Sequence, residues 1–516
     1  MSLTPFKNEP YVDFTQSGPA ELMRKALAQV RGELGKYYPL IIGGESITTD
    51  GTIRSVNPAR PSQVIGETAK ADPELAERAI QVAAETFKEW RKVAPDERAR
   101  YLLRAAAIMR RRIYEFSAWL SFEVSKSWIE AYADVGEAID FMEFYAREMM
   151  RLGTPQPTTF YPGEENEVRY IPLGVGAVIP PWNFPLAILV GMTTAAIATG
   201  NTVVLKPASA SPVIAAKFVE LMMEVGLPAG VINFIPGSGG EMGDVLTSHK
   251  LTRFIAFTGS KEVGLRIFDL ASKHQPGQIW LKRTILEMGG KDCVAVDSPA
   301  DLEMAARDAA AAAFGFQGQK CSAGSRLILH KKVYDEILQG VIERTKKMTI
   351  GNPSEDNVDI GAVIDSGAEK KIAGYIEIGK SEGKLVYQGE APGTDGYYIP
   401  PTIFADVDRN ACIAQEEIFG PVLTVIKAND FEDLSDIVNG TEYGLTGALF
   451  SDNRSHLERA RQDFHVGNLY LNRKCTGALV DVQPFGGFNM SGTDSKAGGR
   501  DYLMLFMQAK SISERW

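Results

Sequence analysis

The spacing of apolar residues divides the chain into regions of different texture. Three long segments, roughly 73–92, 95–125 and 129–150, carry apolar residues at helical spacing. Between residues 175 and 297, short β-branched runs alternate with helical patterns. This alternation is typical of βαβ units, which build a parallel sheet covered by helices, with ligands at the carboxyl ends of the strands. The same texture returns after residue 301, so we expect a second α/β domain.

The same periodicity predicts the individual elements of both α/β regions. In the first region, strands are expected at 175–180, 202–206, 231–235, 253–257 and 294–296, with helices at 186–198, 212–225 and 261–273 and a short helix ending at Ser248. In the second region, helices are expected at 301–314, 332–348 and 366–381, and strands at 326–330, 385–388, 422–427, 447–450 and 466–471.

The flanking segments have shorter patterns. Asp72 and Pro73 mark a helix start, because an aspartate side chain caps free N–H groups and proline suits the first helical position. Residues 160–172 are expected to form an extended hairpin, with residues 163–166 as its turn. The remaining predicted elements are a helix at 21–34 and short strands at 40–45, 52–58 and 64–69, the first of them ending in a turn.

The bulk composition limits the number of domains and the partners. With 516 residues the chain is too long for one core of ordinary size, so two or three domains are expected. With a net charge of -10 and no basic stripe, the chain is not expected to bind nucleic acid. Residues 1–10 hold no apolar leader, and the apolar stretch 186–199 is too short to span a bilayer. We therefore expect a cytoplasmic protein without membrane insertion.

The chain has four cysteines, Cys293, Cys321, Cys412 and Cys475, which are scattered and form no C-x-x-C pair. The five histidines do not stand at metal-ligand spacing. Neither a disulfide framework nor a metal site is expected, and a reducing compartment suits this pattern.

Cys321 lies in the stretch 317–326, Gln-Gly-Gln-Lys-Cys-Ser-Ala-Gly-Ser-Arg, between an alanine-rich helical pattern and an apolar run. A thiol on a glycine turn between two packed elements is well placed to be a nucleophile. Lys320 beside it would favour the thiolate. The alternative is an inert cysteine of the core, which is the commoner role.

Three stretches at the ends of predicted strands suit a nucleotide. Gly259-Ser260 opens a helix whose free N–H groups can bind a pyrophosphate, and Lys206 can donate to a ribose or a phosphate. The turn at 237–243 resembles a dinucleotide fingerprint, although Met242 takes the place of the third glycine. Each stretch alone is equally compatible with a tight turn or a solvated side chain.

Two further polar residues suit catalysis. Asn183 stands between two prolines that fix its loop, and its amide can donate to an oxyanion. Glu287 stands among apolar residues and glycines, where burial would raise its pKa and suit it to general-base work. The alternatives are an ordinary turn and a solvated glutamate.

The chain carries, in order, the motifs Pro181-Trp182-Asn183-Phe184-Pro185, Lys206-Pro207-Ala208-Ser209, Phe257-Thr258-Gly259-Ser260, Leu286-Glu287-Met288-Gly289-Gly290-Lys291, Gly318-Gln319-Lys320-Cys321 and Glu416-Glu417-Ile418-Phe419-Gly420-Pro421. Together they resemble the motifs of the aldehyde dehydrogenase superfamily, and the resemblance extends from about residue 40 to the C-terminus.

The resemblance implies an α/β fold of two doubly wound domains, one a Rossmann-like cofactor domain and one catalytic, with a β-hairpin that bridges subunits. The bounds expected are 1–157 and 173–288 for the NAD-binding domain, 289–483 for the catalytic domain, and 158–172 and 484–516 for the bridging and oligomerisation element.

The resemblance also implies a chemistry. Cys321 would attack an aldehyde to give a thiohemiacetal, whose oxyanion is held by the Asn183 amide and the Cys321 N–H. Hydride transfer to the nicotinamide leaves a thioester, and Glu287 activates the water that hydrolyses it. The cofactor contacts implied are Lys206 and Ser209 at the adenosine ribose, Gly259 and Ser260 at the pyrophosphate, Glu417 and Phe419 at the nicotinamide ribose and ring, and Pro181 and Trp182 beside them.

The cofactor expected is NAD. Many NAD-preferring members of the family carry a glutamate where Ser209 stands, and a carboxylate there repels the 2′-phosphate of NADP. Serine removes that repulsion, so NADP stays possible.

Residues 472–488, Asn-Arg-Lys-Cys-Thr-Gly-Ala-Leu-Val-Asp-Val-Gln-Pro-Phe-Gly-Gly-Phe, indicate the substrate class. They resemble the substrate-anchoring loop of family members that oxidise L-glutamate γ-semialdehyde, formed from 1-pyrroline-5-carboxylate, to L-glutamate in proline catabolism. The backbone N–H groups of Gly477 and Ala478 would bind the α-carboxylate. The other contacts expected are the Ser322 hydroxyl, the rings of Phe184 and Phe485 against the aliphatic stem, and Glu137 near the α-ammonium group.

Three other interpretations stay open. A family member acting on succinate semialdehyde or a betaine aldehyde would need no amino-acid head group. A thiol hydrolase or acyl transferase would use Cys321 and Glu287 without redox chemistry, but leaves the βαβ region unexplained. A non-catalytic binding protein leaves the joint presence of these residues unexplained. Residues 158–170 and 501–516 resemble the subunit-bridging elements of the family, so we expect at least a homodimer.

Overall fold

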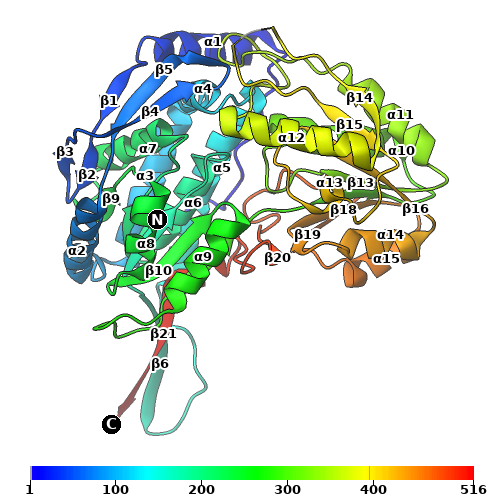
Figure 1. Cartoon of the computed structure of the whole chain (residues 1–516). Coiled ribbons are helices and arrows are strands. Elements are labelled where there is room, and N and C mark those ends of the chain that lie inside the picture. Colours follow the sequence, from blue (N-terminus) through cyan, green and yellow to red (C-terminus); the bar gives the residue numbers. More distant parts are fainter. Residues whose placement is uncertain (1–2, 394) are drawn as a thin grey trace.

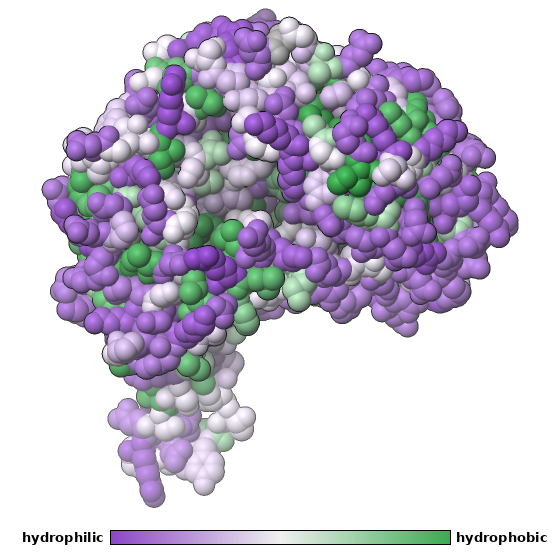
Figure 2. Space-filling view, viewed as in Figure 1, coloured by the Kyte–Doolittle hydropathy of each residue, from purple (hydrophilic) through white to green (hydrophobic). Residues whose placement is uncertain are grey.

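A computed structural model describes residues 3–393 and 395–516 of the chain. Two lobes lie side by side, and a two-stranded ribbon extends away from them (Figure 1). Each lobe contains a seven-stranded sheet with helices packed against it. The surface is recessed where the two lobes meet (Figure 2). The predicted fold class, two α/β domains with a protruding β element, is confirmed.

The sheet of the first lobe contains, in spatial order, β11 (Arg283–Glu287), β10 (Thr252–Thr258), β7 (Val175–Ile179), β8 (Thr202–Leu205), β9 (Ile232–Phe234), β2 (Leu40–Ile42) and β3 (Glu45–Ile47). The strands from β11 to β9 are parallel, whereas β2 and β3 are antiparallel at the edge. Gly43 and Gly44 have φ of 63° and 82°, which is the backbone that the tight turn between β2 and β3 requires. The helices that connect its parallel strands are α6 (Ala187–Ala198), α7 (Pro212–Glu224), α8 (Gly239–Ser248) and α9 (Lys261–Ser272).

Four helices occupy the region where three were predicted: α2 (Pro73–Trp90), α3 (Pro95–Arg111), α4 (Ile113–Glu123) and α5 (Trp128–Leu152). The predicted helix at 95–125 is wrong, because the backbone of Arg112 (φ -108°, ψ 21°) leaves the helical region and divides it. Nearly all of α4 is buried, so it has no polar face. The sequence pattern therefore does not show where α3 ends and α4 begins.

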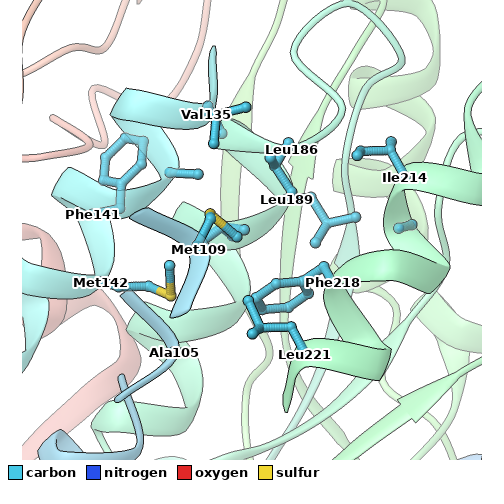
Figure 3. Packing of buried hydrophobic residues seen from close by; sticks show 14 of the residues in the cluster. Ala105, Met109, Val135, Phe141, Met142, Leu186, Leu189, Ile214, Phe218 and Leu221 are labelled. Atoms are coloured by element: carbon cyan, nitrogen blue, oxygen red, sulfur yellow. The ribbon is translucent and has the colours of Figure 1, made fainter. Parts of the chain in front are cut away.

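Side chains from several of these helices pack into one cluster in the first lobe (Figure 3). It includes Met109 of α3, Met142 of α5, Leu189 of α6 and Phe218 of α7, all of them buried. Burial of one such side chain stabilises the fold by about 1.5–3 kcal/mol. The packing fixes α5 against α6, and α5 carries Glu137.

The sheet of the second lobe contains, in spatial order, β14 (Lys384–Gln388), β15 (Thr402–Ala405), β16 (Val422–Ala428), β13 (Arg326–His330), β12 (Cys293–Val296), β18 (Thr446–Phe450) and β19 (Asn468–Leu471). All neighbouring pairs are parallel except β14 with β15. β12 continues the texture of the first region in the sequence, yet it pairs with β13 and β18 of the second sheet. The helices are α10 (Leu302–Phe314), α11 (Tyr334–Thr345), α12 (Ser366–Glu382), α13 (Cys412–Gln415), α14 (Phe431–Asn439) and α15 (Arg454–Asp463), of which the sequence pattern did not indicate the last three.

The ribbon corrects the predicted hairpin. β6 (Glu164–Pro172) pairs antiparallel with β21 (Met507–Arg515) along its whole length. The segment before β6 pairs with it through only one bridge in the described residues, between Gln156 and Val168. The strand β6 itself begins inside the predicted turn. Periodicity identifies an extended segment but carries no information on a partner so distant in the sequence.

The remaining elements are small. A separate sheet has the order β1 (Lys36–Tyr38), β5 (Arg60–Ala69), β4 (Thr52–Asn57), and α1 (Ser17–Arg31) lies near it; the others are β17 (Tyr443–Gly444), β20 (Phe488–Asn489) and two 3₁₀ turns at Gly315–Gly318 and Tyr502–Phe506. None of the helices within residues 3–393 and 395–516 combines the length and apolar character that crossing a membrane requires.

A buried ion pair lies beside the cavity between the lobes. The Lys126 ammonium group is 2.7 Å from the Asp134 carboxylate, and both side chains have 0% exposure. The ammonium group also lies 3.7 Å from the centre of the Phe184 ring and 4.6 Å from that of Phe316. Asp134 accepts a second hydrogen bond from the Ala187 N–H at 2.7 Å, which ties α5 to the start of α6.

Replacing Lys126 with methionine leaves the Asp134 carboxylate buried without its partner. We expect Lys126→Met to lower the free energy of unfolding by about 3–5 kcal/mol, measured by urea denaturation. The control is Lys88→Met, whose ion pair with Glu85 is exposed (65% and 75%). That control should lose less than about 1 kcal/mol, and equal losses in the two variants would contradict the prediction.

Candidate active site

A cavity of about 550 Å³ connects residues from both lobes and from the N-terminal arm. Cys321 and Glu287 both line it. The six residues expected to contact a substrate, which are distant in the sequence, also line it: Glu137, Phe184, Ser322, Gly477, Ala478 and Phe485.

The first lobe contributes the carboxyl ends of four neighbouring parallel strands. Asn183 follows β7, Lys206 follows β8, Gly259 and Ser260 follow β10, and Glu287 ends β11. Because these strands are parallel and adjacent, their ends meet at one edge of the sheet. The expected location of ligand-binding groups therefore holds for this lobe.

The second lobe contributes the opposite ends of its strands. Cys321 precedes β13 and Glu417 precedes β16, so both lie at the amino ends of parallel neighbours. A side chain at Gly318 (φ 65°) would come within 2.3 Å of the Gly420 carbonyl, so only glycine permits the two loops to pack together. In this lobe, Cys321 and Glu417 therefore lie at the strand ends opposite to those that carry the expected site residues of the first lobe.

The loop that carries Cys321 is held by hydrogen bonds to distant backbone. Gln317 has a left-handed backbone (φ 56°), and its amide donates to the carbonyls of Ser125 (3.1 Å) and Ala362 (2.8 Å). The Asn183 amide donates to the Gln319 carbonyl at 3.0 Å. This bond joins the loop of Asn183 to that of Cys321, and the amide has a second N–H.

The Cys321 thiol lies in an environment that disfavours its thiolate. Its pKa is raised, first by burial and then by the nearby carboxyl groups of Asp292, Glu417 and Glu287. Lys320 forms an ion pair with Glu130 at 2.6 Å. Lys320 is not among the main groups that shift the pKa of Cys321, and its charge is paired with Glu130, so the role of Lys320 in favouring the thiolate stays a prediction.

The Glu287 carboxyl group is buried at the end of β11. It accepts hydrogen bonds from the Ser495 hydroxyl at 2.5 Å and from the Gly487 N–H at 3.2 Å. Burial raises its pKa to about 7. A carboxyl group that titrates near neutral pH can both take up and release a proton. Nothing in the sequence pattern singled out Ser495.

The groups expected at the adenosine end lie along the same sheet edge. Lys206 is buried and donates to the Pro207 carbonyl at 3.2 Å. Burial alone lowers its pKa to about 8, and no carboxylate within the described residues compensates its charge. Ser209 is exposed, and Ser260 caps α9 by accepting from the Val263 N–H at 3.4 Å. A buried cation without a protein anion and a helix N-terminus at the same edge of the sheet suit the hydroxyl and phosphate groups of a dinucleotide.

The groups expected at the nicotinamide end come from both lobes. The rings of Trp182, which follows Pro181, and Phe419 meet edge to face at 5.5 Å. Phe419 has a left-handed backbone (φ 58°), and the Glu417 carboxylate accepts from the Gly290 N–H at 3.0 Å. Burial raises the pKa of Glu417.

The loop of Gly477 and Ala478 presents free N–H groups beside the cavity. The Arg473 guanidinium donates to the carbonyls of Thr476 (3.1 Å) and Gly477 (3.0 Å). In the described part of the chain, no acceptor takes up the N–H of Gly477 or of Ala478. Such groups can bind an anion.

Glu137 lines the same cavity, and its ionised carboxylate could bind a positively charged group of a substrate. Its pKa is raised to about 8, mainly by burial and then by the Asp134 charge. A cationic group next to it would favour its ionised form. Other residues that line the cavity were not indicated by the sequence pattern, among them Tyr11, Glu130, Asp140, Arg473 and Ser495.

Comparison with known proteins places this geometry in a family. The model of the aldehyde dehydrogenase family matches residues 46–512. The 1-pyrroline-5-carboxylate dehydrogenase of Geobacillus thermodenitrificans is 59% identical over 510 residues, which cover 99% of this chain and 99% of that protein.

Solved structures show the same similarity. A 1-pyrroline-5-carboxylate dehydrogenase from Thermus with bound NAD has a TM-score of 0.98 and 51% identity, and the alignment covers 100% of both chains. A betaine aldehyde dehydrogenase from Staphylococcus aureus in complex with NAD⁺ has a TM-score of 0.88 and 29% identity, over 96% of this chain and 97% of that one. With a family model matched from residue 46 to residue 512 and relatives that agree along the whole length, this chain belongs to the aldehyde dehydrogenase family.

Proposed function

We propose that this protein oxidises L-glutamate γ-semialdehyde, the ring-opened form of 1-pyrroline-5-carboxylate, to L-glutamate with NAD, the last step of proline catabolism. The observation that carries the proposal is the cavity itself. It has Cys321 and Glu287 on its wall together with the free N–H groups of Gly477 and Ala478, and Glu137 lines it as well. An aldehyde with an α-amino acid head group matches this set, and the names of the full-length relatives support the same substrate.

In the proposed mechanism Cys321 is the nucleophile. Its sulfur forms a bond to the aldehyde carbon while the thiol proton passes to solvent water, and the resulting oxyanion accepts from the Asn183 amide and the Cys321 N–H. NAD, when bound, would supply the acceptor for the hydride that leaves the same carbon. Glu287 then takes a proton from the water that attacks the thioester, which releases L-glutamate and restores the Cys321 thiol.

We propose NAD as the cofactor on two grounds. The Thermus relative was crystallised with NAD, and the residues that would hold a dinucleotide lie along the strand ends of the first lobe. Lys206 and Ser209 would hold the adenosine ribose, and Gly259 and Ser260 the pyrophosphate. Glu417 and Phe419 would hold the nicotinamide ribose and ring, with Pro181 and Trp182 beside them. Ser209 carries no charge to repel a 2′-phosphate, so NADP is a second possible cofactor.

The domain division is also a proposal. The change of sheet between β11 and β12 supports a boundary at residues 288 and 289, and the pairing of β6 with β21 supports a bridging element of residues 158–172 and 484–516. Residues 1–157 and 173–288 then form the NAD-binding domain, and residues 289–483 the catalytic domain. The free cysteines support a reducing compartment such as the cytoplasm.

A second aldehyde, succinate semialdehyde, is the main alternative substrate. It offers a carboxylate for Gly477 and Ala478 but no ammonium group for Glu137. A non-redox thiol hydrolase would leave two features without a role: the buried charge of Lys206, which no carboxylate in the described residues compensates, and the residues at the strand ends that suit a dinucleotide.

The central test follows formation of reduced nicotinamide by absorbance. Wild type should oxidise L-glutamate γ-semialdehyde with kcat/KM at least about tenfold higher than succinate semialdehyde, equivalent to about 1.4 kcal/mol of transition-state preference. Cys321→Ala should abolish the reaction with both aldehydes. A preference for succinate semialdehyde would contradict the proposed substrate, and reduction of no nicotinamide with any aldehyde would contradict the whole mechanism.

The hydrolytic step should depend on pH through Glu287. Its pKa is raised to about 7, so the carboxylate that serves as base disappears as the pH falls below that value. We expect steady-state turnover to be about tenfold lower at pH 6 than at pH 8, while the first turnover appears as a burst. Glu287→Gln should be slow at both values and lose the dependence. Turnover that is flat from pH 6 to pH 8 at saturating substrate would exclude this role.

The exposed apolar residues near the ribbon support a homo-oligomer, at least a dimer. Phe160, Tyr161 and Trp516 are 79%, 63% and 74% exposed, and Ile279 and Leu281 on a neighbouring loop are 84% and 82% exposed. Sedimentation equilibrium should give at least twice the mass of one chain, and Ile279→Ser combined with Leu281→Ser should weaken the association. A monomer at micromolar concentration would contradict the proposal.

A further inference from the structure

The N-terminal arm forms part of the wall of the aldehyde cavity. Glu9, Pro10 and Tyr11 line it together with residues of α5 and the loop of Gly477. These arm residues precede the part of the chain that the family model matches, which begins at residue 46. The family model therefore does not cover them.

Aromatic contacts hold the arm on both sides of this wall. Before it, the Phe6 ring packs against Phe144 of α5 at 5.3 Å. After it, the buried Phe14 ring meets the rings of Trp128 and Tyr132, both on α5, at 5.7 Å and 6.0 Å. Such pairs add about 0.5–1.5 kcal/mol each beyond burial of their area. The stretch between them is thus held at two points.

Hydrogen bonds then join the wall to the cavity residues. The Asn8 amide donates to the Asp140 carboxylate and to the Val480 carbonyl, each at 3.0 Å, and the Glu9 N–H donates to the other Asp140 oxygen at 2.8 Å. Asp140 is one turn beyond Glu137 on α5, and Val480 is two residues beyond Ala478. Asn8 therefore connects the helix that carries Glu137 with the loop that presents the free N–H groups.

Tyr11 lies within electrostatic range of the charged residues of the cavity. Its pKa is raised first by burial and then by Glu137, Glu130 and Asp140, whereas Arg473 lowers it. The side chain is exposed on one side and lines the cavity on the other. A phenol in this position can donate to a carboxylate and accept from an ammonium group.

We infer that residues 8–11 are a specificity-determining wall of the substrate pocket, in which Asn8 positions the anchoring loop against α5 and Tyr11 closes the pocket around an α-amino acid head group. This inference rests on the proposed function. We expect a short aldehyde that reacts at Cys321 but has no head group to make no contact with these residues. Their loss should therefore affect amino-acid aldehydes selectively.

The test compares two aldehydes in two variants of the full-length chain, Tyr11→Ala and Asn8→Ala. For L-glutamate γ-semialdehyde we expect kcat/KM to fall about tenfold or more, mainly through a higher KM. For propanal, which has no head group, kcat/KM should stay within about twofold of wild type or rise. The matched control is Lys7→Ala on the same arm, because Lys7 is exposed and does not line the cavity. Its kinetics should be those of wild type with both aldehydes.

Two results would overturn the inference: equal losses with both aldehydes, which would mean that the arm supports the fold only, or unchanged kinetics with both. Thermal unfolding of each variant shows whether the fold is retained. Failure of the proposed function is a separate outcome, in which wild type itself shows no preference for L-glutamate γ-semialdehyde. In that case the test of the wall compares kcat/KM for hexanal with kcat/KM for propanal, since we expect the longer aldehyde to contact the wall. An unchanged ratio in both variants would then overturn the inference.

Discussion

The buried ammonium group of Lys126 is the interaction on which the arrangement of the site depends. It pairs with Asp134 and lies between the rings of Phe184 and Phe316. Phe184 directly follows Asn183, and Phe316 opens the left-handed turn that leads to Cys321. A buried charge that loses its partners is costly, so this cation favours a single arrangement of the two loops. The position of the nucleophile relative to the oxyanion donor thus depends on a residue that does not line the cavity.

Burial also determines the charges of the ionisable groups that line the cavity. Burial raises the pKa of Glu287 to about 7 and that of Glu137 to about 8, and it also raises the pKa of the Cys321 thiol. Burial therefore disfavours the charged form of each of these groups, and a nearby positive charge from a ligand would favour it. Substrate and cofactor binding are therefore part of what would activate the site, and the ammonium group of an amino acid is suited to ionise Glu137.

The two lobes bring different ends of their sheets to the site. The first lobe uses the carboxyl ends of β7, β8, β10 and β11, as open α/β sheets do for nucleotides. The second lobe uses the amino ends of β13 and β16, which bring Cys321 and Glu417 to face that edge. The N-terminal arm closes the remaining side with Asn8 and Tyr11. A reaction site of this kind exists only once both sheets have formed.

Local sequence patterns were sufficient to predict most of the individual elements and the residue types of the chemistry. The periodicity placed α10 and β13 within one residue of their observed bounds, because a helical or alternating pattern is a property of neighbouring residues. Ordered motifs predicted the family and the six residues expected around a substrate, all of which line one cavity.

The contacts between distant segments became visible only in the folded chain: β6 with β21, β12 with the second sheet, Ser495 with Glu287, and Asn8 with Asp140 and Val480. A local pattern records which face of an element is buried. The partner against which that face packs results from the collective fit of the whole core, which no short segment of sequence contains.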